Sequence, residues 1–125
     1  QRMNAGRGAA GRATWVADLM RQHGTLLLQP LMDYLVHRSD LRILGPALTQ
    51  NRAPTVALAL GRPGFDVARD LAPLGILAGG GDFYAVRPLR AMGIDPGHGV
   101  LRLSFVHYTL ADEVDRLIQA LDQVL

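Results

Sequence analysis

Arg102 is the first candidate for a ligand-binding side chain, because it stands between small or apolar neighbours. The segment 100–106 is typical of a strand, in which side chains alternate between two faces. Leu101, Leu103 and Phe105 then meet the core, and Arg102 projects from the opposite face. A guanidinium there can hold a carboxylate by two parallel hydrogen bonds. The pattern alone favours a solvated arginine on an open sheet face over such a clamp.

A run of three glycines at 79–81 is the second candidate. Glycine lets backbone N–H groups approach an anion closely. The run matches neither the phosphate-binding loop, which needs a lysine, nor the dinucleotide fingerprint, so we expect a flexible loop. Asp82, Phe83 and Tyr84 follow it directly, and Arg87 comes shortly after. This mixture of charge and aromatic surface is typical of loops that face ligands.

The residue types that are scarce or absent exclude several chemistries. The chain has no cysteine and no lysine, so it offers neither a thiolate nucleophile nor an amine for a Schiff base with a carbonyl cofactor. His23, His37, His98 and His107 lack the spacing of metal ligands, and we expect no metal site. His107 ends the last expected strand with Tyr108, where it either faces a site or lies on the surface.

The length and the charge distribution limit the classes of protein to which this chain can belong. With 125 residues and a hydrophobic share of 49%, the chain forms one compact domain or a piece of a longer protein. Three of the 13 arginines precede the first acid, Asp18, and the remainder is nearly neutral. A nucleic-acid surface needs basic residues clustered on a folded face, so we expect no nucleic-acid partner. No apolar run approaches the roughly 20 residues of a membrane span. Because the chain opens at Gln1, we expect its natural N-terminus upstream.

Hydrophobic periodicity predicts the order α, β, β, α, β, α, β, α. The first helix covers 14–37, where Gly24 and Pro30 predict a kink or two separate helices. The expected strands are 41–44, 54–60, 76–78 and 100–106, and the further helices are 67–74, a short one that ends at Met92, and 110–125. Asp66, and Thr109 with Asp112, are expected to cap helices.

This order fits an α/β (α+β) sandwich in which a small, mostly antiparallel sheet carries helices on one face. We divide the chain into a Gly/Arg-rich lead-in of residues 1–13, a linking helix region of residues 14–38 and a small α/β domain of residues 39–125.

The segment 100–117 resembles the C-terminal end of the class V aminotransferases, the pyridoxal 5'-phosphate (PLP) enzymes that include cysteine desulfurases and selenocysteine lyases. Its arginine strand, its turn at residues 107–109 and its helix with the residues Asp-Glu-Val-Asp-Arg-Leu follow the pattern of that family. Residues 52–56 resemble the strand that opens the family's small domain, and residues 81–85 resemble its active-site loop. The resemblance spans roughly residues 26–125.

The resemblance implies the small C-terminal domain of a fold type I enzyme whose large PLP domain is absent from this chain. Arg102 matches the arginine that binds the α-carboxylate of the substrate. Tyr84 takes the place of the persulfide cysteine of desulfurases, and a phenol cannot take sulfur by thiolate attack. Asp82 takes the place of a histidine, and His107 is a further candidate contact to the substrate.

The family attaches PLP to a lysine of the large domain. Because this chain has no lysine, the resemblance implies that it is inactive by itself. It would supply the carboxylate clamp and the active-site loop to a large domain or to a second subunit. The complete enzyme would be a cytoplasmic homodimer, a lyase or aminotransferase that acts on a small amino acid and has no membrane partner.

Two alternatives stay open. The chain could be a stand-alone α/β domain that binds amino acids through Arg102 and regulates another protein, or a nucleic-acid binder that uses its N-terminal arginines. An exposed apolar sheet face around Val100 and Val106 would favour the enzyme domain. Saturable binding of amino acids by the isolated chain would favour the regulatory domain, and retention on DNA that needs residues 1–12 would favour the third reading.

Overall fold

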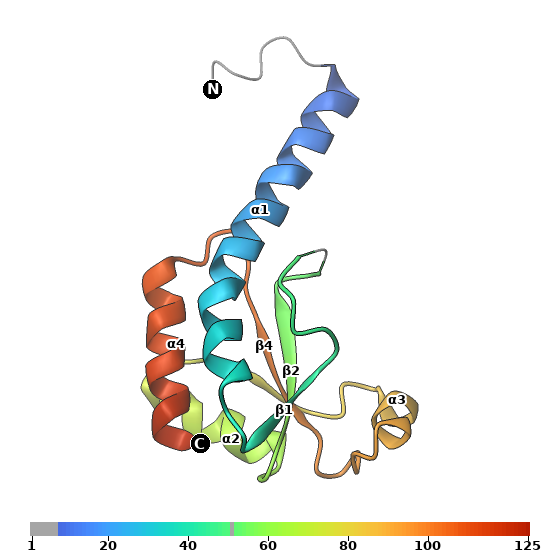
Figure 1. Ribbon diagram of the computed structural model, residues 1–125, viewed down its shortest axis with the longest axis vertical. Helices are drawn as coiled ribbons and strands as arrows, with labels where there is room; N and C mark the ends of the chain where they lie inside the picture. The colour runs from blue at the N-terminus through green and yellow to red at the C-terminus, as the bar shows by residue number, and fades with distance from the viewer. Residues whose placement is uncertain (1–7, 51) are drawn as a thin grey trace.

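The computed structural model describes residues 8–50 and 52–125 (Figure 1). The elements are α1 (Ala9–Val36), β1 (Leu41–Leu44), β2 (Thr55–Leu60), α2 (Gly64–Leu71), the 3-10 helix η2 (Ala72–Leu74), β3 (Gly79–Gly81), α3 (Val86–Ala91), β4 (Val100–Ser104) and α4 (Ala111–Val124). The predicted order of helices and strands is confirmed. Of the expected lead-in, residues 1–7 lie outside the described residues, and α1 already begins at Ala9.

The four strands form one antiparallel sheet in the order β1-β2-β4-β3. Alternation along β2 buries Val56, Leu58 and Leu60 on one face. In β4 the same face takes Leu101 and Leu103, while Arg102 and Ser104 stay exposed on the other. The predicted alternation of the last strand is therefore confirmed. We call the face that carries Arg102 the open face.

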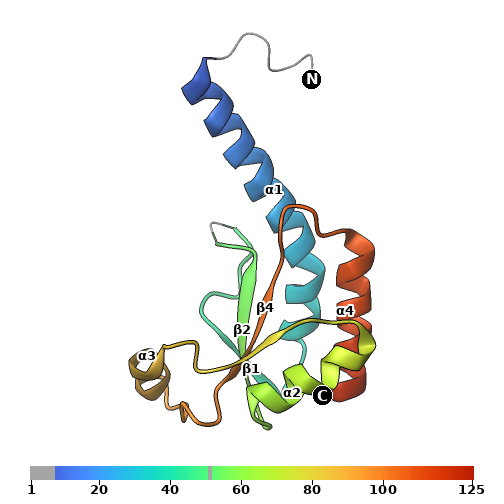
Figure 2. The ribbon, with the colours of Figure 1, turned by 180° about the vertical axis from the view of Figure 1, so that it is seen from behind.

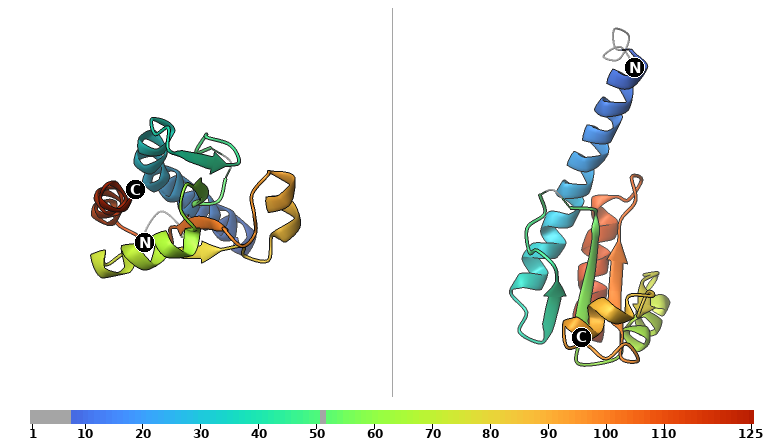
Figure 3. Two further views of the ribbon diagram at one scale, coloured as in Figure 1. Left: turned by 90° about the horizontal axis from the view of Figure 1, so that it is seen from below. Right: turned by 90° about the vertical axis from the view of Figure 1, so that its right-hand side faces the viewer.

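Three helices cover the other face of the sheet. Figure 3 shows α2, α4 and the C-terminal half of α1 on one side of the strands, and the short helix α3 on the opposite side. The core is built from buried side chains of these helices and of the covered face: Leu28, Leu31, Leu35, Val56, Leu58, Val67, Leu71, Leu101, Leu103, Val114, Leu117 and Leu121. The predicted sandwich with helices on one face is confirmed, and α3 is the exception.

The first helix is one continuous helix, so of the two predicted alternatives, a kink or two separate helices, the second is excluded. Pro30 lies inside α1, where it has no N–H to donate to the preceding turn. The axis of α1 changes direction between its N-terminal half, which projects beyond the sheet, and its C-terminal half, which packs on it (Figures 1 and 2). No helix of the described residues is long and apolar enough to cross a membrane.

The three glycines form β3, so the predictions of a flexible loop there and of a strand at 76–78 are both wrong. Glycine is needed because β3 lies directly on the start of α2. A Cβ on Gly80 would stand 2.3 Å from the carbonyl oxygen of Gly64, and a Cβ on Gly64 would stand 2.2 Å from that of Val100. The short strand thus pairs with β4 at the edge of the sheet and packs on α2 through bare backbone.

Two predicted helix caps are also wrong. Pro63 rather than Asp66 precedes α2, and Asp66 lies in the first turn. At α4 the N-cap is Leu110 rather than Thr109. The carboxylate of Glu113, rather than that of Asp112, accepts the backbone N–H of this cap residue at 2.8 Å. Thr109 instead accepts the N–H of Val106 through its hydroxyl at 3.1 Å, which closes the turn before the helix.

We predict that Gly80→Ala lowers the free energy of unfolding by about 3 kcal/mol, because the new methyl group overlaps the backbone of α2. Gly61→Ala is the matched control, since a Cβ at Gly61 meets nothing within 4 Å and its φ is ordinary. Urea unfolding followed by circular dichroism measures both. Equal stability of the two variants would contradict the close packing of β3 on α2.

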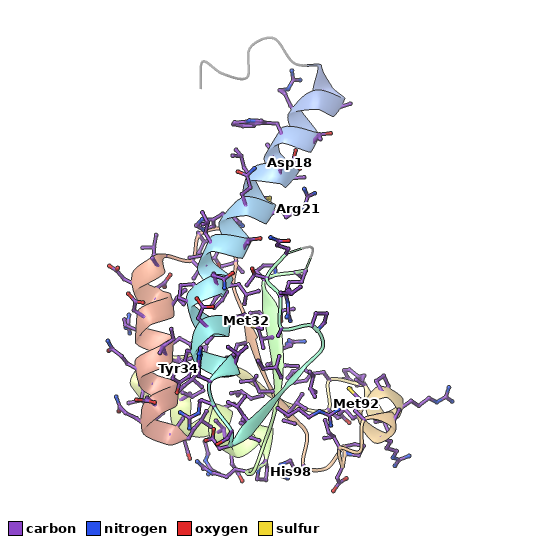
Figure 4. All side chains as sticks on the ribbon, in the orientation of Figure 1. Asp18, Arg21, Met32, Tyr34, Met92 and His98 are labelled. Carbon is purple, nitrogen blue, oxygen red and sulfur yellow. The ribbon has the colours of Figure 1, made fainter. Side chains whose placement is uncertain are left out.

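A polar cluster joins the end of α1 to α4. The guanidinium of Arg38 binds both carboxylate oxygens of Asp40, at 2.8 and 2.5 Å, and donates to the hydroxyl of Tyr34 at 2.7 Å. Tyr34, which is labelled in Figure 4, donates to Asp122 of α4 at 3.1 Å. The hydrogen bonds from Arg38 lower the pKa of Asp40 below its ordinary 3.8, and burial raises the pKa of Tyr34.

The lowered pKa of Asp40 makes this cluster sensitive to acid. Its contribution to stability is complete above the ordinary pKa of 3.8 and is lost as the pH falls through the lower pKa of the folded state. Asp40→Asn should therefore lower stability at neutral pH and flatten the loss of stability below pH 4. Asp33→Asn is the control, because Asp33 accepts from Gln29 rather than from an arginine. Identical acid unfolding of the wild type and Asp40→Asn would contradict this prediction.

Candidate functional site

Arg102 projects from the middle of β4 onto the open face. Its cross-strand neighbours are Ala57 on β2 and Gly79 on β3, and both leave space above the sheet. The guanidinium carbon lies 4.2 Å from the centre of the Phe83 ring. Within residues 8–50 and 52–125, no carboxylate pairs with Arg102 and no acceptor takes a hydrogen bond from it. Its N–H donors are thus free to bind an anion.

The ring of Phe83 occupies the space that Gly79 leaves. A Cβ on Gly79 would stand 2.9 Å from Cζ of Phe83 and 3.0 Å from Cε1. Since Gly79 pairs with Arg102 across the strands, one glycine admits the ring beside the guanidinium. The sequence pattern placed both residues in a candidate ligand-facing segment, but it did not predict the contact between Gly79 and the ring of Phe83. The sequence features that point to this contact are a glycine in an edge strand and an aromatic residue shortly after it.

The loop from Asp82 to Ala85 has a strained backbone. Phe83 has φ 50° and Tyr84 has φ 60°, which are the described non-glycine residues in the left-handed region. Such angles cost energy in residues that carry a Cβ and gather at functional sites. The carboxylate of Asp82 accepts the N–H of Tyr84 at 3.1 Å, and its carbonyl accepts the N–H of Ala85 at 2.8 Å. Asp82 thus holds the turn, and the side chain of Tyr84 is fully exposed.

The structure separates His107 from Arg102. The strand β4 ends at Ser104, and the ring of His107 packs edge-on against Tyr108 with a centroid distance of 5.1 Å. His107 lines a cavity of about 400 Å³ that lies between α1 and residues 52–54 and contains neither Arg102 nor the Asp82 loop. Of the four residues predicted for the site, Asp82 and Tyr84 share one turn, and this turn reaches Arg102 through the ring of Phe83 that lies between them in the sequence.

The expected apolar face beside Arg102 is only partly present. Val100 is buried, and Val106 is exposed and lines the cavity beside His107. Arg52 also lines this cavity, donates to the carbonyls of Pro46 and Thr55, and has a buried Nε without a partner among the described residues. Among those residues, no group of acids and histidines is placed to hold a metal ion. Among the described residues, the open face therefore offers the unpaired guanidinium of Arg102 and the ring of Phe83, and the exposed phenol of Tyr84 follows in the same turn.

Proteins that are similar to this chain in sequence or fold include an aminotransferase-like protein and two cysteine desulfurases. The aminotransferase-like protein FGM3 of Gibberella zeae is 29% identical over 124 residues, which cover 94% of this chain and 30% of that protein. The cysteine desulfurase CsdA of Escherichia coli is 27% identical with a TM-score of 0.70, and the cysteine desulfurase of Thermococcus onnurineus is 21% identical with a TM-score of 0.75. No family model matches the chain.

The fold is that of the small domain of cysteine desulfurases. The chain is similar in sequence to an aminotransferase-like protein and a cysteine desulfurase, and in fold to a NifS-like protein, so its predicted resemblance to the class V aminotransferases is confirmed. The chain spans 30% of the length of the aminotransferase-like relative, 25% of the Escherichia coli desulfurase and 26% of the Thermococcus onnurineus desulfurase. It therefore corresponds to one domain of these proteins.

Proposed function

We propose that this chain is the substrate-binding small domain of a PLP-dependent enzyme of the class V aminotransferase type. The observation that carries the proposal is the unpaired guanidinium of Arg102 on the open face of a fold shared with cysteine desulfurases. An arginine on a surface strand ordinarily finds a carboxylate of its own chain or water. Here the neighbours across the sheet are Ala57 and Gly79, which supply no acceptor side chain.

Arg102 would hold the α-carboxylate of an amino acid. A guanidinium binds a carboxylate through two parallel N–H···O bonds, which fix the orientation of the ligand as well as its charge. Each charge-assisted bond of this kind is worth about 1.5–3 kcal/mol. The open face would therefore fix one end of the substrate and leave its amino group and side chain to the rest of the site.

The residues of this chain fit the substrate side of such a site and not the attachment of the cofactor, because none of them is a lysine. When bound, PLP supplies an electron sink for the bonds around the α-carbon. We propose that a large domain outside these 125 residues holds the cofactor, and that the chain is inactive without it. The family resemblance further supports a cytoplasmic homodimer as the complete enzyme.

Tyr84 argues for a reaction other than desulfuration by a residue of this chain. In the resembled loop it stands where a desulfurase carries its persulfide, and a phenol oxygen cannot carry one. Its exposed side chain, next in sequence to the Phe83 that contacts Arg102, suits a contact to the substrate or to the large domain. Asp82 would act indirectly, by holding the turn that presents Tyr84.

The proposal is tested by Arg102→Gln in the full-length protein that contains these residues, loaded with PLP. Loss of the charge-assisted bonds should lower kcat/KM for the amino acid substrate by about 10- to 100-fold, mainly through KM. Turnover is measured over a panel of amino acids by the disappearance of substrate. Arg42→Gln is the matched control, because Arg42 lies on the same face but donates to the carbonyl of Met92 at 2.9 Å.

Two results would contradict the proposal. The first is an unchanged KM in Arg102→Gln. The second is saturable, Arg102-dependent binding of amino acids by the 125-residue chain at micromolar concentration, together with no uptake of PLP by the full-length protein. That second result would support a stand-alone amino-acid-binding domain.

A further inference from the structure

We propose that Phe83 is a positioning residue that holds the guanidinium of Arg102 ready for a carboxylate. The inference rests on the proposed function of Arg102 as a clamp and adds a second residue to it. It is carried by three observations: the contact of the ring with the guanidinium, the glycine that makes room for the ring, and the strained turn that presents it.

The first observation concerns which part of the guanidinium is used. A guanidinium is flat, its N–H bonds lie in its plane, and its faces are free to stack on aromatic rings. The guanidinium carbon of Arg102 lies over the ring of Phe83, 4.2 Å from its centre, which is a cation–π contact. The in-plane N–H donors that a carboxylate needs remain unpaired within the described residues. Stacking and binding of the anion are therefore compatible.

The second observation is the site that the ring occupies. Gly79 pairs with Arg102, and a Cβ at this position would stand 2.9 Å from the Phe83 ring. Gly80 is required for a different reason, namely the contact of β3 with α2 on the covered face. Gly80 thus makes room for α2 on the covered face, and Gly79 makes room for the Phe83 ring on the open face. Only Gly79 lies beside Arg102.

The third observation is the turn that delivers the ring. Phe83 and Tyr84 both adopt left-handed backbone angles, and the carboxylate of Asp82 holds the turn through the N–H of Tyr84. Among the described residues, Phe83 belongs to no part of the hydrophobic core, so burial of the ring in the core does not repay this strain. The contact of the ring with Arg102 and Gly79 is the gain that the structure shows.

A long arginine side chain loses rotamer freedom when it binds a ligand. A partner that already restricts the side chain lowers that cost and raises affinity. The contrast with Arg42 supports this assignment, because Arg42 projects from the same face, is held by a carbonyl of its own chain and has no aromatic partner among the described residues. Phe83 restricts Arg102 without using its donors.

The test compares Phe83→Leu, Phe83→Tyr and the control Phe65→Leu, whose exposed ring lies on α2. In the full-length protein with PLP, Phe83→Leu should raise KM for the amino acid about three- to five-fold, with kcat unchanged. Phe83→Tyr should restore the wild-type KM because its ring also stacks, and Phe65→Leu should have no effect.

A second measurement is the chemical shift of the Arg102 Nε–H group, recorded by nuclear magnetic resonance in the 125-residue chain. This shift would not change if Phe83 only stabilised the fold. The signal is identified by its absence in Arg102→Gln. We expect an upfield ring-current shift in the wild type and in Phe83→Tyr, and its loss in Phe83→Leu and in Gly79→Ala. Titration with acetate should show about three-fold weaker binding in Phe83→Leu.

The outcomes separate the two proposals. If acetate perturbs Arg102 equally in the wild type and in Phe83→Leu, and KM is unchanged, the clamp stands and the role of Phe83 is overturned. If acetate leaves Arg102 unperturbed in the wild type and KM does not depend on Arg102, the proposed function fails and the inference fails with it. A dispersed amide spectrum of each variant confirms that it is folded.

Discussion

The cross-strand pair of Arg102 and Gly79 is the contact on which the candidate site depends. Antiparallel pairing of β3 with β4 sets the two residues side by side on the open face. A Cβ on Gly79 would stand 2.9 Å from Cζ of Phe83, so the ring would have to move from its place beside the guanidinium. The strand β3 lies at the edge of the sheet, where Gly80 allows it to pack on α2 through its backbone.

On both faces of the sheet, positions with a small side chain or none matter as much as positions with large side chains, because they decide what can approach the strands. On the covered face, Leu101 and Leu103 enter the core while Gly80 lets α2 approach the strand. On the open face, Ala57 and Gly79 supply no side-chain acceptor for the guanidinium of Arg102. The burial of apolar surface on one side thus holds the strand that presents a charge on the other.

The sequence predicted the parts of the fold that depend on local periodicity. The alternation in β4 and the last helix, α4, follow from apolar spacing, and both were confirmed. The strand at 79–81 could not be predicted in this way, because glycine carries no hydrophobic pattern and its pairing depends on a distant strand. The separation of His107 from Arg102 was missed for a related reason: β4 ends at Ser104, before the extended pattern ends in the sequence.

The charge balance of the open face explains why Arg102 remains available. An unpaired arginine attracts any carboxylate within reach, and Asp82 lies next to the ring that contacts it. The carboxylate of Asp82 instead accepts the N–H of Tyr84, and among the described residues it makes no ion pair with Arg102. The same bond supports the left-handed angles that bring Phe83 over Gly79. Asp82 thus stabilises the turn through which an uncharged ring, rather than its own carboxylate, contacts the guanidinium.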